Sequence, residues 1–229
     1  QGYGGGGAPA TLYLDAQGNA ITQQEMGGDA EESGLRELLR VAANETVRSV
    51  GHEGGYSQNP AIRLLLPGSL QKVSKVLRKI GMEHKLQSLE HALNRAAERA
   101  ALKALPIFEA FIRGLHLRDV KHMLVGSKQD RASPATDLFR QRTEADLKRA
   151  YEPVVQESMG ECGVAQAYSA VGKAVENLPF IGGGALPDLL QYTVGKALQG
   201  LFTVLAEQEA KIRRNPAKQA SSLIKLILR

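Results

Sequence analysis

The chain has 229 residues, of which 43% are hydrophobic and 5% aromatic, with no tryptophan. This hydrophobic share is enough for a real core, which excludes a disordered protein, and no apolar run reaches the roughly 18 to 20 residues of a membrane span. The 29 basic and 24 acidic residues give a net charge of +5 and are interspersed along the chain. Interspersed charge is typical of a solvated surface, and the basic stretch from Lys72 to Lys85 lacks the aromatic residues that stack on bases, so nucleic acid is not expected as a partner.

The amino-terminal segment differs in composition from the rest of the chain. Residues Gln1 to Pro9 are glycine-rich, and Thr11 to Gln23 contains two short apolar runs around a Gly18-Asn19 turn signal. This pattern predicts a small β-hairpin, which is marginal in isolation and must lean on its own helical body or on another chain. If it contacts a neighbouring subunit, the self-association residues are Tyr3, Leu12, Tyr13, Leu14 and Ile21.

Helical periodicity is predicted to begin near Asp29 and to continue to the end of the chain. The first helix should run from Asp29 to Val50 and stop at Gly51, and the second from Pro67 to Ile80 with its lysines facing water. No long polar linker divides the remainder of the chain. We therefore expect a tail and hairpin over residues 1–28 and one all-α, multi-helix domain over residues 29–229.

A helix from Met82 to Leu105 is predicted to lie at the centre of this domain. Five alanines between Ala92 and Ala101 leave little bulk on its surface, so other helices can approach closely. Polar residues four apart share one of its faces, which is unusual unless partners reach them. We interpret this face as a structural polar seam, in which Asn94 and Glu98 pair with arginines of other helices; its members are Glu90, Asn94, Arg95, Glu98, Arg140 and Arg213. Two carboxylates on one face could also bind a metal, but the Glu-x-x-His spacing of helical di-metal sites is absent.

Capping and breaking residues predict the remaining helices. Pro106 should break or kink the chain before a short apolar segment. The helices expected after it, with their boundary signals, are Leu117–Val125, a helix from Ser133-Pro134 to Ala150, one starting at Pro153 and interrupted near Gly160 to Gly163, Asp188–Arg214, and a last one from Asn215-Pro216.

Four stretches together resemble the bacterial DUF4197 family: Asn59–Met82, Leu89–Ala101, Ala135–Thr143 and Ala197–Ala217. The resemblance covers roughly Asp29 to Arg229 and implies an exported helical protein without an assigned function. The sequence departs from the family pattern at Val194-Gly195, where a Thr-Asp pair is usual, and at Gln199, where an acid is usual. A family site that depended on those acids would lack them here.

The expected location is outside the cytoplasm. The chain begins at Gln1, and the resemblance implies a secretory signal upstream, so we expect a secreted or periplasmic protein whose signal peptide has been removed. The single Cys162 excludes an intrachain disulfide framework and a multi-cysteine metal site, and its apolar neighbours favour a buried structural thiol.

The sequence lacks the usual catalytic motifs, including His-Glu-x-x-His, Gly-x-Ser-x-Gly and the phosphate loop. We therefore expect no enzyme, no metal and no cofactor. The favoured function is a structural protein that self-associates through its amino-terminal tail into a homo-oligomer or filament. The alternative is a periplasmic carrier that binds a lipid or other apolar ligand in a cavity between helices, with a lining of phenylalanines: Phe108, Phe111, Phe139, Phe180 and Phe202.

Overall fold

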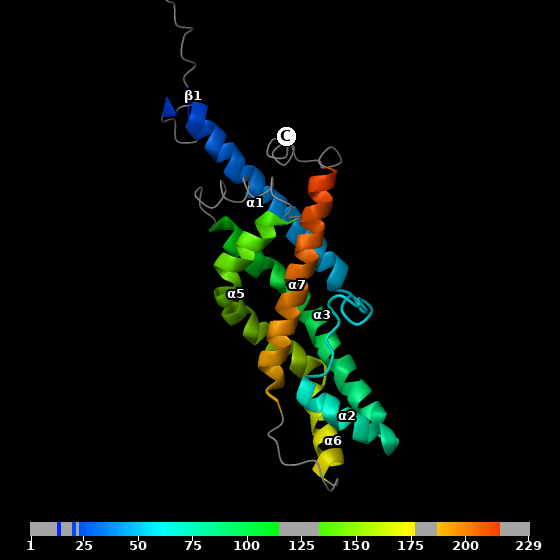
Figure 1. Cartoon of the computed structure of the whole chain (residues 1–229). Coiled ribbons are helices and arrows are strands. Elements are labelled where there is room, and N and C mark those ends of the chain that lie inside the picture. Colours follow the sequence, from blue (N-terminus) through cyan, green and yellow to red (C-terminus); the bar gives the residue numbers. More distant parts are fainter. Residues whose placement is uncertain (1–12, 15–19, 22, 115–132, 177–186, 216–229) are drawn as a thin grey trace, which may run out of the picture.

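The computed structural model of the chain describes residues 13–14, 20–21, 23–114, 133–176 and 187–215 (Figure 1). The body is all-helical, as the sequence predicts. Its helices are α1 (Gln23–Val50), α2 (Gly68–Lys79), α3 (Glu83–Arg113), α5 (Pro134–Glu161), α6 (Val164–Glu176) and α7 (Leu189–Arg214). Ahead of them, β1 (Tyr13–Leu14) and β2 (Ala20–Ile21) pair antiparallel over two residues each. The helix expected over 117–125 and the one after Pro216 lie outside the described residues.

Helix α3 lies at the centre of the body, because it contacts α1, α2, α5, α6 and α7. Its alanines make this possible: Ala96, Ala97, Ala100 and Ala101 are fully buried. Small side chains let the neighbouring helices pack close to the α3 backbone, where bulkier residues would hold them apart. The central helix expected from Met82 to Leu105 is therefore present, and it is longer than expected at its carboxyl end.

Two prolines lie inside helices, although Pro106 was expected to break or kink the chain and Pro153 to begin a helix. Pro106 lies within α3 and Pro153 within α5. A proline removes one backbone donor, which frees the carbonyl of the residue four positions earlier. Here those residues, Leu102 and Arg149, are exposed, as are both prolines. Water can therefore take the freed carbonyls, and the apolar stripes of both helices continue past the proline.

Glycines end the helices where the sequence predicts. Gly81, with φ +76°, follows α2, and the Met82 backbone N–H donates to the carbonyl of Leu77 over 2.8 Å; this is a Schellman turn. Gly163, with φ +69°, separates α5 from α6. The start of α1 differs, since it begins at Gln23 and so crosses the expected boundary at residue 28. The Gly27-Gly28 pair lowers helix propensity but does not stop this helix.

The connection between α1 and α2, residues 51–67, belongs to the core. Tyr56 and Leu64 are fully buried, and Ile62 and Leu66 nearly so. Figure 1 shows this segment as a cyan loop beside α3 and α7. A loop at such a position must satisfy its backbone donors and acceptors without water. The polar residues of α3 and α7 meet that requirement.

Candidate functional site

Helix α3 places Glu90, Asn94 and Glu98 on one face, at intervals of four residues. The first of these residues is partly exposed and the other two are buried: the Glu90 side chain is 31% exposed, whereas Asn94 and Glu98 are 1% and 2% exposed. Buried polar groups need hydrogen-bond partners, since an unpaired carboxylate or amide in the core is costly. Most partners of Asn94 and Glu98 come from the loop between α1 and α2.

Glu98 binds the backbone of that loop. Its Oε1 accepts hydrogen bonds from the backbone N–H groups of Gly54 (3.1 Å), Tyr56 (3.2 Å) and Ser57 (3.3 Å), and from the Ser57 hydroxyl (3.3 Å). Its Oε2 lies 3.4 Å from Nη1 of Arg95, which also contacts Glu53 at 3.2 Å. The carboxylate is thus occupied on both oxygens, and it fixes the turn that brings Tyr56 into the core.

Asn94 pairs with the same loop further along. Its Oδ1 accepts from the Leu64 backbone N–H at 2.9 Å, and its Nδ2 donates to the Leu64 carbonyl and the Glu90 carbonyl, both at 2.8 Å. The side-chain amide of Asn94 therefore satisfies both the backbone N–H and the backbone carbonyl of the buried Leu64. Together, Asn94 and Glu98 attach the whole loop to α3.

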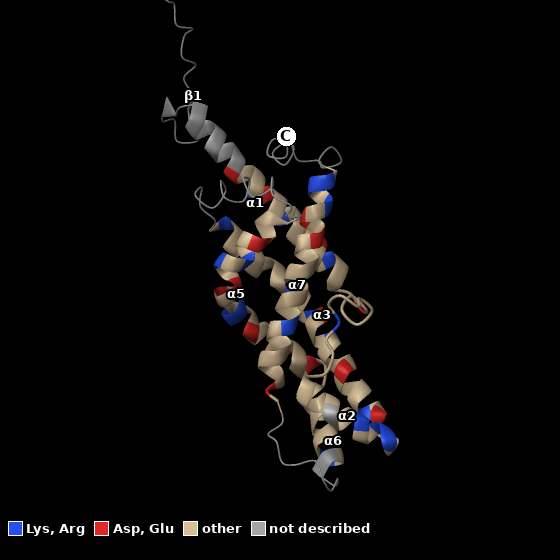
Figure 2. Cartoon of the chain, viewed as in Figure 1, with Lys and Arg blue, Asp and Glu red and all other residues tan. Residues whose placement is uncertain are grey.

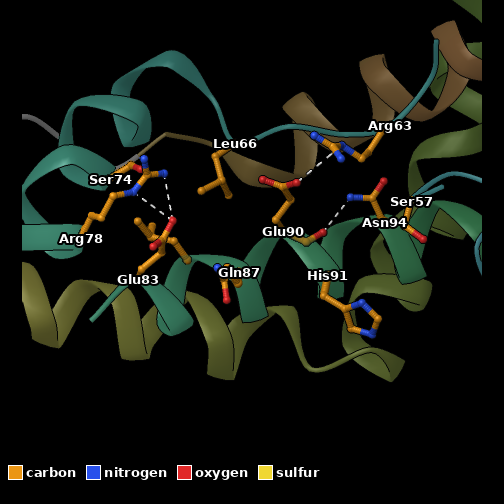
Figure 3. Close-up of a pocket in the computed structure, with 11 residues that line it drawn as sticks. Ser57, Arg63, Leu66, Ser74, Arg78, Glu83, Gln87, Glu90, His91 and Asn94 are labelled. Carbon is orange, nitrogen blue, oxygen red and sulfur yellow. Dashed lines mark hydrogen bonds and ion pairs between the residues drawn. The ribbon is translucent and has the colours of Figure 1, made fainter. Parts of the chain in front are cut away.

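A groove lies beside the exposed end of this seam (Figure 3). It has a volume of about 260 Å³ and lies between α2, the loop and the first turns of α3. Two ion pairs lie along it: Arg63 Nε is 3.8 Å from Glu90 Oε1, and Arg78 Nη2 is 2.9 Å from Glu83 Oε1. In Figure 3 the His91 ring points away from the Arg63–Glu90 pair. Both carboxylates that line the groove therefore already have cationic partners.

A second buried carboxylate, Glu209 on α7, was not predicted. It is fully buried and accepts hydrogen bonds from the backbone N–H groups of Ala135 (3.0 Å) and Thr136 (2.7 Å), from the Thr136 hydroxyl (2.7 Å) and from Nε of Arg213 (2.6 Å). It caps the amino terminus of α5, where free N–H groups favour a negative charge. Ser133, the expected cap of this helix, makes no such bond with its side chain.

The sequence does contain a signal for this second site. Glu209 lies four residues after Leu205 and three before Ile212, both of which are buried. An acid at that spacing falls on the apolar stripe of its helix and must have a partner in the core.

The predicted seam is therefore divided between two places in the structure. Glu90, Asn94, Arg95 and Glu98 lie together on α3, but the arginines of the other helices do not join them. Arg213 pairs with Glu209, and Arg140 pairs with Glu144 (3.0 Å) while its guanidinium lies over the Phe202 ring. The expectation that these two arginines meet Asn94 or Glu98 is wrong, because the loop of residues 51–67 covers that face.

The residues expected to mediate self-association cannot be placed in the same way. Tyr3 and Leu12 lie outside the described residues. Tyr13 and Leu14 form β1, and Ile21 ends β2, but only their backbones are described. Their role stays a prediction.

Other groups that could carry chemistry are accounted for in the described part of the chain. There, no three His, Cys, Asp or Glu residues come together in a way that could hold a metal ion. Burial raises the pKa of the half-buried Cys162 thiol, against the opposing effect of Arg99 and Arg95, and a raised pKa disfavours the nucleophilic thiolate. None of the described helices has the length and apolar character to cross a membrane.

The phenylalanines that a carrier would need around its ligand fill space instead. The Phe108, Phe139 and Phe202 rings contact one another at centroid distances of 5.9 to 6.1 Å, and each residue is at most 2% exposed. Phe111 packs against the same core, whereas Phe180 lies outside the described residues. Rings at this distance form aromatic core contacts and leave no room for a ligand between them.

Comparison with known proteins identifies the family of this chain. A family model described as "Protein of unknown function (DUF4197)" matches residues 25–228. Neither a curated protein nor a solved structure matches the chain.

Proposed function

This chain belongs to the DUF4197 family, and we propose that it is a non-catalytic structural protein that acts outside the cytoplasm and self-associates through its amino-terminal segment. One observation gives the most support to a structural, non-catalytic role. Both buried carboxylates, Glu98 and Glu209, are saturated by hydrogen bonds from backbone N–H groups, hydroxyls and arginines of the fold itself. The two acids thus hold a loop and a helix end in place.

The connection between the amino-terminal segment and the helical body supports self-association. A single residue, Thr22, separates the end of β2 at Ile21 from the start of α1 at Gln23. A link of one residue spans only a few ångströms, so the paired segment lies next to the start of the first helix. A neighbouring subunit that bound the β1–β2 segment would therefore be held close to α1, and repetition of that contact would build an oligomer or an open filament.

The location outside the cytoplasm rests on the family resemblance alone. Fractionation of cells that express the protein from its natural locus tests it. Recovery from the periplasm or the medium is expected, and recovery only from the cytoplasm would contradict the proposal.

The experiment that tests self-association compares masses in solution. Light scattering across a concentration series would be measured for the full chain and for a variant that lacks residues 1–22, so that α1 stays intact. A full-length triple variant, Tyr13→Ser, Leu14→Ser and Ile21→Ser, separates the role of these side chains from that of chain length. Circular dichroism confirms that each variant keeps its helices.

We expect the full chain to form species larger than a monomer as concentration rises, and both variants to remain monomeric with unchanged helicity. Equal masses for all three proteins would overturn the proposal. A change in the truncated variant but not in the triple variant would place the contact elsewhere in the tail.

A further inference from the structure

The turn between α2 and α3 exposes two large apolar side chains next to each other. Ile80 is 47% exposed and Met82 is 37% exposed, on either side of Gly81. In the described part of the chain, the other large apolar residues with comparable exposure are Leu65 and Leu102, which lie apart. Isolated exposed apolar residues are ordinary, whereas neighbouring ones at the end of a helical hairpin form a small apolar surface that can serve in an interaction.

The turn itself holds this pair outside the core. The core face of α2 is already provided by Leu70, Val73 and Leu77, all of them buried. The Schellman bond from Met82 to the Leu77 carbonyl and the positive φ of Gly81 then direct the chain around the tip. Neither Ile80 nor Met82 is needed to cover α2 or α3, so their exposure is a property of the native fold.

Cationic residues surround the apolar pair. Lys75, Arg78 and Lys79 are exposed on α2, and Lys85 follows on α3. The one carboxylate in this stretch, Glu83, is bound by Arg78, whose Nε lies 3.0 Å away. Figure 2 shows these basic residues at the end of the molecule where α2 joins α3. The α2–α3 tip, which we define as residues 75–85, is therefore both basic and apolar.

A shallow groove with two lysines in its lining lies next to the tip. It runs between α3 and α6, with a volume of about 520 Å³, and Lys85 and Lys173 line it. The rest of its lining is small or uncharged, including Ala165, Ser169 and Ala170, and contains no acidic residue. The groove thus extends the basic character of the tip along α3.

We propose that the α2–α3 tip docks on the surface of a bilayer that contains anionic phospholipids. Ile80 and Met82 enter the boundary between headgroups and acyl chains, while Lys75, Lys79 and Lys85 contact headgroup phosphates. Cations and apolar side chains on one short element are the combination that an anionic membrane interface attracts. Charge alone would suit any polyanion, but the apolar pair distinguishes a lipid surface from a nucleic acid.

The binding test uses the full chain with two kinds of vesicle, phosphatidylcholine alone and phosphatidylcholine with phosphatidylglycerol, in co-sedimentation at low and high salt. The tip variants are Ile80→Ser with Met82→Ser, and Lys75→Gln with Lys79→Gln. The matched controls are Leu102→Ser for an exposed apolar residue and Lys148→Gln with Lys211→Gln for two exposed lysines elsewhere. Circular dichroism verifies that every variant is folded.

We expect the full chain to bind the anionic vesicles only, and salt to weaken this binding. Either tip variant should lower the affinity about tenfold or more, which corresponds to about 1.4 kcal/mol. The control variants should change the affinity less than about twofold. Loss of binding in the lysine controls as large as in the tip lysines would overturn the proposal, because it would show attraction by net charge. Unchanged binding after loss of Ile80 and Met82, or no binding at all, would overturn it as well. Binding of an oligonucleotide with the same dependence on both tip variants would also contradict a lipid-specific site.

Insertion has a separate optical test. Since the chain has no tryptophan, Met82→Trp introduces a unique fluorophore at the tip and Leu102→Trp a control at a distant exposed site. The emission of the Met82→Trp protein should shift to the blue on anionic vesicles, whereas that of Leu102→Trp should not. Equal behaviour of the two proteins would show that the tip does not enter the bilayer.

Discussion

Two successive segments of α3, residues 83–90 and 94–98, carry similar polar residues on one face, yet their polar groups have different partners. In the first segment, Glu83 and Glu90 pair with arginines whose side chains are 67% and 48% exposed. Further along the helix, towards its middle, Asn94 and Glu98 are buried and bind the backbone of a loop. The difference shows that sequence spacing identifies a polar face, but only the partner of each group tells whether that group maintains the fold or remains available at the surface.

The largest expected effect concerns the second buried carboxylate. Glu209→Ala leaves two amides of α5, the Thr136 hydroxyl and Arg213, whose side chain is 13% exposed, without their acceptor. Breaking a buried pair of this kind should lower the free energy of unfolding by about 3–5 kcal/mol. The control is Glu144→Ala, which removes an exposed Arg–Glu pair with the same spacing and should cost at most about 1 kcal/mol. Urea unfolding that gives equal losses would refute the distinction between buried and exposed acids.

A smaller effect tests how tightly α7 packs on the loop that α3 holds. A Cβ at Gly200 would lie 2.6 Å from Cε1 of Tyr56, which is fully buried, whereas a Cβ at Gly195 meets nothing within 4 Å. Gly200→Ala should therefore lower stability by about 1–3 kcal/mol through overpacking. Gly195→Ala, on the same helix, should raise it by about 0.5–1 kcal/mol through helix propensity. The two substitutions are compared by thermal or urea unfolding, and a shared sign would contradict the packing described here.

Two buried tyrosines provide a finer test of partnered and unpartnered polar groups. The Tyr56 hydroxyl donates to the Ala197 carbonyl at 2.7 Å, whereas the Tyr151 hydroxyl has no hydrogen-bond partner in the described part of the chain. Tyr56→Phe should cost about 1 kcal/mol, while Tyr151→Phe should be neutral or stabilising by up to about 1 kcal/mol. Opposite behaviour in denaturant unfolding would show that the assignment of partners is wrong.

The same tyrosines predict a loss of stability at alkaline pH. Burial raises the pKa of Tyr56 and Tyr151 above its ordinary value. The fold therefore holds both in the neutral form, and an unfolded chain releases their protons near pH 10. Their contribution to the free energy of unfolding is complete below about pH 10 and is lost as the pH rises above that value. In an absorbance titration of tyrosinate, these two residues should ionise only as the helices unfold, and Tyr151→Phe should extend the folded range upward. An unchanged alkaline midpoint for that variant would contradict this account.

Local signals allowed much of the fold to be predicted. The end of α2 at Gly81, the separation of α5 and α6 at Gly163 and the extent of α7 follow from glycines and capping residues. The helix break allowed for at Pro106 does not occur, because the rule for prolines takes no account of exposure. The carbonyl that this proline frees belongs to an exposed residue, and whether a helix position faces water is settled by tertiary packing.

The candidate site was predicted less well, because its partners are distant in sequence. Asn94 and Glu98 were correctly identified as a polar face, but Glu98 bonds to a residue 44 positions earlier and Glu209 to one 74 positions earlier. Backbone N–H groups are present at every residue except proline, so no residue type marks the loop that supplies them. Arginines can be recognised by residue type, which is why the sequence analysis expected them, and not the loop backbone, to bind Asn94 and Glu98.

The central claim, that the buried part of the α3 seam is structural, is tested most directly by the unfolding free energies of Glu98→Ala and Glu90→Ala in urea. Both glutamates lie on the same face of the same helix. Loss of Glu98 removes the acceptor of three amides and the Ser57 hydroxyl and should cost about 3 kcal/mol, whereas loss of Glu90 should cost less than about 1 kcal/mol. Equal costs, or a Glu98→Ala protein as stable as the parent, would contradict the account.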